Sequence, residues 1–314
     1  MKLPAALGLT LLILACAGPA TGPVKGVLVV YDPSITMDEL NMFIDSVQLT
    51  VTSVKEEDVF DFSVCTRDLF QGDLRSRRTV LFLTLSPEDM PEGLEGPGPV
   101  YQGSDLWAED QVVLGAVLPG FTASAELSRA LEDAYDRHLA DYIYGSFVAT
   151  QMSSPQRIDS LLTLGFSMDI PKSYGLESWR PETGFIQYQR VVSDQCLLIL
   201  TIRWLEDGRR LSPEEAVLWR ESVARNFFYD AGADSVDRSR VQSEPLELHG
   251  ATGMRLLGMW RNPEHLNAGA FTSYILFFGE TRFLLDLEVF HEHREKEPYI
   301  REGWIIMNTF VPGR

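Results

Sequence analysis

Short runs of hydrophobic residues in the first half of the chain alternate with longer patterns of helical period. Runs of β-branched and aromatic residues between turn residues predict buried strands, at residues 27–31, 59–65, 79–85 and 111–118. A capping box at Thr36 and Glu39 predicts a helix after it, and a longer helix is expected over residues 122–151. Strands that alternate with helices predict an α/β layer domain over residues 26–152.

In the second half, hydrophobic runs come in pairs separated by short turns, which is the pattern of β-hairpins. The predicted pairs are 185–192 with 196–205, 241–248 with 251–260, and 270–278 with 281–290. Ser212, Pro213 and Glu215 form a second capping box, and a last helix is expected over residues 296–310. An antiparallel sheet with flanking helices is therefore predicted over residues 153–314. The expected fold class is α/β, of the α+β kind, with two tandem domains.

Residues 86–106 interrupt these patterns with four prolines, several glycines and acidic side chains. Loops this long are uncommon in compact domains unless they are functional or disordered. We expect a solvated acidic excursion here, and a functional loop is the alternative.

The chain begins with Lys2 and an apolar run over residues 5–15. A membrane-spanning helix needs about 20 apolar residues, so this run is too short to span and has the length of an export signal. It ends on the sequence ILAC, which resembles the lipobox of bacterial lipoproteins. We expect residues 1–15 to be removed as a signal peptide and Cys16 to carry lipid. An ordinary secretory signal cut near Ala20 is the alternative.

Residues 16–25 would then form an acylated tether, because they are mostly Gly, Pro, Ala and Thr and have little to pack. By analogy with lipoproteins, Ala17 rather than Asp after the cysteine favours the outer membrane. Several acyl chains would hold the protein there stably, whereas a single chain binds only marginally. The expected location is the cell envelope, with the folded part facing the periplasm.

The formal net charge is −18, from 27 Lys and Arg against 45 Asp and Glu. Binding to nucleic acid relies on neutralising phosphates, so this charge argues against nucleic acid as a partner. Besides Cys16, only Cys65 and Cys196 remain. They could form a disulfide outside the cytoplasm or lie buried as small hydrophobic side chains, and the sequence leaves both possibilities open.

Several short motifs, taken in order, resemble those of one family. They are VLVVYD at 27–32, LWA at 106–108, GFSMDIP at 165–171, GMRL at 253–256 and GAFTSY at 269–274. With the lipobox they resemble the DUF4837 family of uncharacterised envelope lipoproteins, a resemblance that implies an address but no activity. Residues 165–310 alone also look like the Mog1/PsbP-type sandwich, which implies binding or assistance in assembly more than catalysis.

The sequence contains no nucleophile elbow, no Ser-x-x-Lys pair, no zinc-protease helix motif and no glycine-rich phosphate loop. The densest titratable cluster holds His291 and His293, which would project to one face of a strand and could bind zinc. Glu288 or His265 are conceivable third ligands. A polar strand end is the alternative interpretation.

Four residues are candidates for a partner or ligand surface: Trp107, Trp260, Arg261 and His265. The last three lie where a predicted strand leaves the sheet, and an aromatic ring beside a cation is a common binding element. Core packing is the alternative for both tryptophans.

These features favour a non-catalytic envelope lipoprotein that binds or assembles with an unknown periplasmic protein or small molecule, without a cofactor. One alternative is a hydrolase-type or metal-dependent enzyme with a site between the domains. Another is a small-molecule sensor gated by residues 86–106.

Overall fold

The computed structural model describes residues 18–145, 161–193, 195–228, 234–291 and 294–313. Contacts divide the chain into two compact units. Of the described residues, the first unit holds residues 18–46 and 62–131, and the second holds residues 47–61 and those from 132 onward. This division differs from the limit expected after residue 152, because two segments of the first half pack with the C-terminal half.

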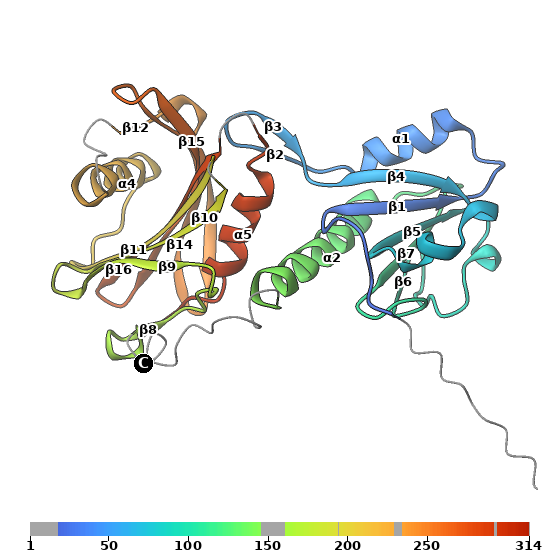
Figure 1. Ribbon diagram of the computed structural model, residues 1–314, viewed down its shortest axis with the longest axis horizontal. Helices are drawn as coiled ribbons and strands as arrows, with labels where there is room; N and C mark the ends of the chain where they lie inside the picture. The colour runs from blue at the N-terminus through green and yellow to red at the C-terminus, as the bar shows by residue number, and fades with distance from the viewer. Residues whose placement is uncertain (1–17, 146–160, 194, 229–233, 292–293, 314) are drawn as a thin grey trace, which may run out of the picture. The chain divides into compact units, whose positions relative to one another are not determined.

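The first unit is built on a five-stranded sheet with the order β4-β1-β5-β7-β6. Strands β1, β5 and β7 run parallel, and β6 pairs antiparallel with β7. The strands are β1 (Gly26–Tyr31), β4 (Asp61–Thr66), β5 (Thr79–Thr84), β6 (Val100–Ser104) and β7 (Val112–Val117). Helices α1 (Met37–Val47) and α2 (Ser124–Gly145) complete the unit, and α2 continues into the second unit (Figure 1).

The predicted capping box at the start of α1 is confirmed. The Thr36 N–H donates to Glu39 at 2.9 Å, and the Glu39 N–H donates to Thr36 Oγ1 at 3.3 Å. Leu40 and Phe43 follow at helical spacing and are buried, so local capping and the apolar face together determine this helix.

The segment expected as a solvated excursion is partly structured. Its residues 100–104 form edge strand β6, and Met90, Leu94 and Leu106 pack against the core of the first unit. The glycines and prolines of this segment indicated a loop. Its pairing with β7 is a tertiary contact, which cannot be predicted from local composition.

The expected tether is also paired where it is described. The Ala20 N–H donates to the Glu109 carbonyl at 2.8 Å, and the Thr21 N–H donates to the Ser76 carbonyl at 2.6 Å. Arg78 returns a backbone hydrogen bond to Thr21 at 2.9 Å. Residues 18–22 therefore belong to the folded first unit, while Cys16 lies outside the described residues.

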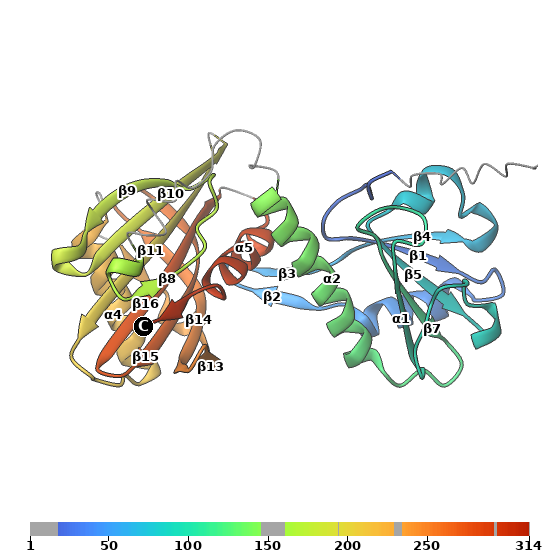
Figure 2. The same ribbon diagram turned by 90° about the horizontal axis from the view of Figure 1, so that it is seen from below.

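The second unit is built on an eight-stranded antiparallel sheet with helix α4 (Pro213–Phe227) on one face and helix α5 (Glu297–Met307) on the other (Figures 1 and 2). The order is β12-β14-β15-β16-β11-β10-β9, and β13 pairs with β14. The strands are β9 (Gly175–Arg180), β10 (Phe185–Ser193), β11 (Cys196–Glu206), β12 (Ser235–Val236), β13 (Gln242–Leu248), β14 (Ala251–Asn262), β15 (Asn267–Phe278) and β16 (Thr281–His291).

Two short strand pairs accompany this sheet. Strand β8 (Phe166–Ser167) pairs with β17 (Val311–Pro312), and β2 (Thr50–Thr52) forms a hairpin with β3 (Glu56–Asp58). The three predicted hairpins all occur, as β10–β11, β13–β14 and β15–β16. The chain is thus an α/β protein whose second half is an antiparallel sheet flanked by helices, as the sequence predicted.

Alternation along the strands assigns side chains to the two faces of this sheet. On β16, Asp286 and Glu288 contact Arg220 of α4, whereas Leu287 faces Gly303 of α5. The face toward α4 holds the site described next.

Candidate functional site

Helix α4 carries a buried cation to the sheet. The helix begins at the second predicted capping box, in which the Glu215 N–H donates to Ser212 Oγ at 3.3 Å and the Ser212 N–H donates to Glu215 Oε2 at 2.9 Å. Farther along, Arg220 is only 1% exposed. Its guanidinium lies over the Phe271 ring, 4.2 Å from the centroid. A cation this deeply buried requires anionic partners.

Two carboxylates of β16 meet this arginine. The Nε and Nη2 atoms of Arg220 each donate to Asp286 at 3.2 Å, and Nη2 also donates to Glu288. The Ser273 hydroxyl donates a further hydrogen bond to Asp286. One guanidinium charge therefore compensates only one of two buried carboxylate charges.

The excess of carboxylates over cations affects the pKa values of Glu288 and Arg220. Burial raises the pKa of Glu288 above its ordinary value; Arg220 opposes this effect, and the charges of Asp286 and Asp234 add to it. Burial lowers the pKa of Arg220, but its two carboxylate partners outweigh burial and raise it. The arginine therefore keeps its proton, and Glu288 is the group whose charge is under-compensated.

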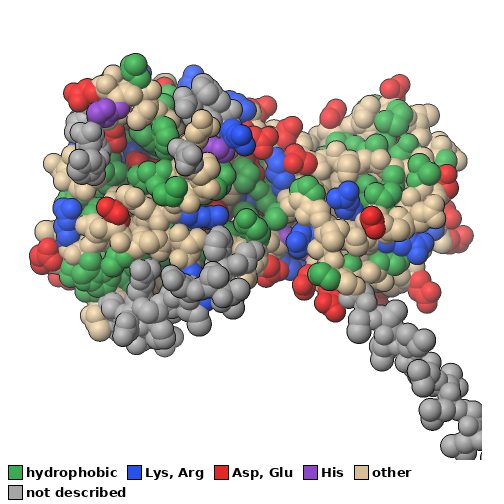
Figure 3. Space-filling view, in the orientation of Figure 1, with side chains coloured by type: hydrophobic (Ala, Val, Ile, Leu, Met, Phe, Trp, Pro, Cys, Tyr) green, Lys and Arg blue, Asp and Glu red, His purple; other side chains and the backbone are tan. Residues whose placement is uncertain are grey.

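A cavity of about 570 Å³ lies on this face of the sheet, and Glu288 is one of its walls. We call it the Trp260 pocket. Its apolar lining is Leu197, Ile199, Phe228, Trp260 and Phe290, and its polar lining is Gln187, Gln189, Asp234, Asn262, His265, Asn267 and Glu288. In the space-filling view, hydrophobic side chains gather over the second unit, on the left, with acidic and basic side chains among them (Figure 3).

The polar corner of the pocket is organised by Asn262. Its Nδ2 donates to Asp234 Oδ1 at 2.7 Å. Its Oδ1 accepts from the backbone N–H groups of Glu264 at 3.0 Å and His265 at 3.1 Å, which is an Asx-type turn. Burial raises the pKa of Asp234, and the hydrogen bond from Asn262 opposes that rise. A second carboxyl group is thus held, partly desolvated, at the pocket.

The indole N–H of Trp260 is a buried hydrogen-bond donor. The side chain is 7% exposed, and in the described part of the chain its buried Nε1 has no hydrogen-bond partner. The indole lies over Gly269, where a Cβ atom would come within 2.8 Å of Nε1. A buried N–H without a partner costs about 1–3 kcal/mol, so an acceptor in the pocket would stabilise this arrangement.

The four residues proposed from sequence are placed differently. Trp260 and His265 both line the pocket. Arg261 is exposed and, by strand alternation, projects to the other face of β14. Trp107 belongs to the first unit, where its ring packs against Phe70 at 5.1 Å and Phe82 at 5.8 Å.

Sequence reasoning did not single out Arg220, Asp286 or Asp234. A signal was present, because β16 reads FLLDLEVF and two carboxylates interrupt an otherwise apolar strand. Arg220 likewise interrupts the apolar face of its helix. Charges inside apolar patterns need partners, but the sequence does not say which ones.

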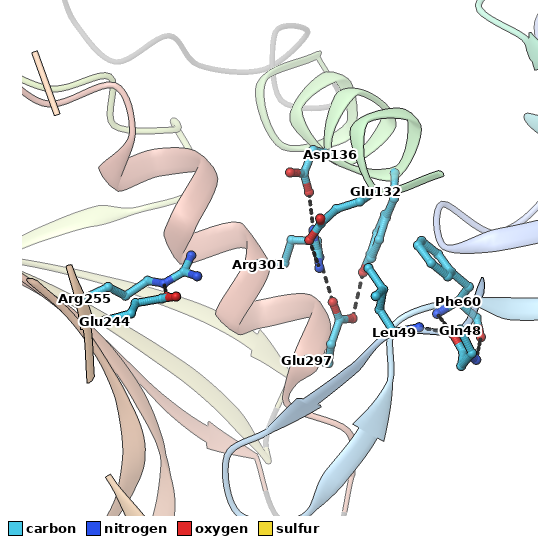
Figure 4. A network of polar contacts seen from close by, with 10 residues as sticks. Gln48, Leu49, Phe60, Glu132, Asp136, Glu244, Arg255, Glu297 and Arg301 are labelled. Atoms are coloured by element: carbon cyan, nitrogen blue, oxygen red, sulfur yellow. Dashed lines mark hydrogen bonds and ion pairs between the residues drawn. The ribbon is translucent and has the colours of Figure 1, made fainter. Parts of the chain in front are cut away.

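A second polar cluster lies on the opposite face of the sheet, around the buried side chain of Arg301 (Figure 4). Arg301 donates to Glu297 at 2.8 Å, Asp136 at 2.7 Å and Glu132 at 3.1 Å. Tyr135 donates to the other oxygen of Glu297 at 3.0 Å. These bonds fasten the second part of α2 to α5. We interpret the cluster as structural, because each nitrogen of the guanidinium already donates to a carboxylate.

Glu57 of the β2–β3 hairpin caps helix α5. Its Oε2 accepts the backbone N–H groups of Lys296 at 2.6 Å and Glu297 at 2.7 Å. A carboxylate at a helix N-terminus satisfies donors that lack intrahelical partners and interacts favourably with the helix dipole. This contact, together with hydrogen bonds from Arg240 to the Val54 carbonyl and from Gln242 to the Thr52 carbonyl, joins residues 47–61 to the second unit.

The predicted zinc pair can be followed only in part. His291 Nδ1 lies 3.3 Å from the Glu295 carbonyl, and the ring packs edge-on against Tyr299. His293 lies outside the described residues. Within the described ranges, no group of three or more His, Cys, Asp or Glu side chains is arranged to hold a metal ion. Cys65 and Cys196 are both free thiols in the structure.

Comparison with known proteins adds little to this picture. No family model matches the chain, and no curated protein matches it. In the described part of the chain, no helix has the length and apolar character to cross a membrane.

Several solved structures match part of the chain, among them the following three. One is a protein of Bacteroides thetaiotaomicron VPI-5482, with 8% identity over 48% of this chain and 45% of that one and a TM-score of 0.27. Cyanobacterial PsbP (CyanoP) of Synechocystis sp. PCC 6803 has 11% identity over 48% of this chain and 88% of its own, with a TM-score of 0.32. LpqN of Mycobacterium tuberculosis, involved in cell envelope biogenesis, has 10% identity over 48% of this chain and 83% of its own, with a TM-score of 0.30. The chain thus spans less than half of the Bacteroides protein. TM-scores this low do not establish a common fold, so the fold described above rests on the chain's own strands and helices.

Proposed function

We propose that this protein is an envelope lipoprotein whose second unit binds a small organic ligand in the Trp260 pocket. The observation that carries the ligand-binding proposal is an apolar cavity bordered by buried polar groups that the protein itself leaves under-compensated. These are the Glu288 carboxyl group and the Trp260 N–H. A folded protein retains such groups at a cost, and a ligand that pairs with them would offset it.

The size of the cavity favours a small molecule over a protein partner. Pockets for small ligands measure roughly 300–1,000 Å³ and combine apolar walls with a few polar groups. The Trp260 pocket, at about 570 Å³, has this composition. A docking surface for a protein would instead be expected to be shallow and free of buried titratable groups.

The envelope address comes from the sequence. Lipid on Cys16, the outer membrane and kinship with the DUF4837 or Mog1/PsbP-type proteins remain proposals from the leader and motifs. Among the described residues, Gly18 is already paired, because its carbonyl accepts from the Glu109 N–H at 3.0 Å. Two extended residues span at most about 7 Å, so an acylated Cys16 would hold the first unit close to the bilayer surface.

Nile red tests the cavity itself, because this probe is neutral and its fluorescence rises in apolar surroundings. We expect the full chain to bind it with saturable, one-to-one enhancement. Leu197→Trp places a large ring in the pocket wall and should abolish the enhancement. Leu205→Trp is the matched control, since Leu205 is also half-buried on β11 but does not line the pocket. Equal enhancement in the two variants would overturn the proposed binding site.

A further inference from the structure

Carboxyl groups outnumber cationic side chains at the polar end of the Trp260 pocket. Asp286, Glu288 and Asp234 are each less than 7% exposed, and Arg220 pairs with the first two. Two further arginines lie in this region, and both Arg225 and Arg238 pair with a fourth buried carboxylate, Glu221. Arg225 Nε also donates to the Asp234 backbone carbonyl at 2.6 Å, and its charge favours the ionised Asp234 carboxyl group. The four carboxyl groups therefore still outnumber the three arginines. His265 also lines the pocket.

Two carboxylate oxygens at this end retain acceptor capacity. Glu288 Oε1 accepts from Arg220, and Asp234 Oδ1 accepts from Asn262. Within the described residues, no donor reaches the second oxygen of either group. Both side chains line the cavity, so a donor-bearing group that enters it meets two carboxylates.

The remaining walls combine apolar and aromatic side chains with the amides of Gln187, Gln189 and Asn267. Leu197 and Ile199 lie on β11, and the rings of Phe228, Phe290 and Trp260 border the same space. Aromatic faces favour a nearby cation, and the aliphatic side chains favour an apolar body. From the excess of buried carboxylates beside an apolar wall, we propose that the ligand is a small organic cation, with an ammonium or guanidinium head on an apolar body. This inference rests on the proposed function.

The pKa values of the carboxyl groups are consistent with this assignment. Burial raises the pKa of both Glu288 and Asp234 by more than the nearby arginines lower it. A bound cation favours the ionised carboxylate, so its arrival lowers these pKa values and releases protons. A neutral or anionic head would not release protons in this way.

A series of three probes that share one body separates the head groups. The probes are 3-phenylpropylamine, 3-phenylpropan-1-ol and 3-phenylpropionate. Binding to the full chain is followed through the Trp260 indole N–H resonance in ¹H–¹⁵N NMR spectra, which Trp260→Phe identifies by its loss. Titration calorimetry in phosphate and in Tris at pH 7 counts protons, because the two buffers differ in ionisation enthalpy.

We expect the amine to shift the Trp260 resonance and to bind at least about tenfold more tightly than the alcohol, as for a hydrogen bond to a charged group. Amine binding should also release protons. Glu288→Gln and Asp234→Asn should each weaken it about tenfold, and Glu288→Gln should reduce the proton release. Glu264→Gln is the matched control, because it removes one charge near the Asn262 turn without lining the pocket.

The outcomes separate this inference from the proposed function. If the alcohol or the acid shifts the Trp260 resonance as strongly as the amine, the cationic ligand is excluded while the pocket stands as a binding site. If none of the three probes shifts it and Nile red also fails, both proposals are overturned. Amine binding that survives both carboxylate substitutions would likewise exclude the cationic assignment.

Discussion

Arg220 and Asp286 face each other across the interior of the second unit, joined by two hydrogen bonds of 3.2 Å between helix α4 and strand β16. Removing the cation would leave Asp286 and Glu288 buried without their partner. We therefore expect Arg220→Met to lower the free energy of unfolding by about 3–5 kcal/mol at pH 7, measured by urea denaturation. Arg225→Met is the control, because Arg225 is partly exposed and should change stability by less than about 1 kcal/mol. Equal losses in the two variants would contradict a buried, essential pair.

The stability of the protein should depend on pH through Glu288. Its pKa in the folded state is raised by burial, so the folded protein holds this proton more tightly than the unfolded chain. The associated stability is present below the unfolded pKa, about 4.3, and is lost as the pH rises through the raised folded value. The free energy of unfolding of Glu288→Gln, relative to that of the natural protein, should therefore increase from pH 5 to pH 8. Urea denaturation of both proteins at the two pH values measures this difference. A difference that does not change with pH would argue against a raised pKa.

Glu57 should stabilise helix α5 through its cap on Lys296 and Glu297. We expect Glu57→Ala to cost about 1–2 kcal/mol, the range for loss of a helix cap, and thermal denaturation followed by circular dichroism measures it. Glu56→Ala removes the same charge from the neighbouring exposed position and should be close to neutral. A cost shared by both variants would indicate a general charge effect.

Gly269 should be required for the position of the Trp260 indole. A Cβ atom there would lie 2.1 Å from the Val289 carbonyl oxygen and 2.8 Å from Trp260 Nε1. We expect Gly269→Ala to destabilise the protein by about 1–3 kcal/mol and to move the Trp260 resonance. Gly175→Ala on strand β9 should be tolerated, because a Cβ atom there would lie 3.7 Å from its nearest neighbour, the Gln189 carbonyl oxygen. An unchanged Trp260 resonance in Gly269→Ala would mean that the indole does not depend on this close approach.

Lipid attachment is tested at Cys16. We expect Cys16→Ser to leave the membrane fraction and to lose the mass of the acyl chains, because the acyl chains are the proposed anchor. Fractionation of cells and intact mass spectrometry of both proteins measure this. A serine variant that is equally membrane-bound and equally processed would exclude the lipoprotein interpretation.

Hydrophobic period and local capping were sufficient to predict the helices after Thr36 and Ser212 and the three hairpins of the second unit. Each depends on residues close together in the chain. The hairpin β2–β3 and strand β9 were missed because they are short or carry largely exposed residues, so they lack a clear apolar pattern. Their pairing depends on neighbours elsewhere in the structure.

Only part of the candidate site could be predicted from the sequence. Trp260 and His265 attracted attention as an aromatic residue and a titratable residue at a strand exit, and both line the pocket. Their partners could not be inferred, because Arg220 and Asp286 are 66 residues apart and Asp234 and Asn262 are 28 apart. The unmet N–H of Trp260 is likewise a property of its surroundings.

By itself, the sequence determined the alternation of strands and helices, the acidic charge and the expectation of a lipid anchor, because each is encoded by neighbouring residues. Only the tertiary structure decided that residues 47–61 pack with the C-terminal half and that two carboxylates meet one arginine beside a cavity. Those relationships depend on which distant side chains become buried together. Burial desolvates a carboxylate, and a buried carboxylate is stable only with a donor or a cation beside it.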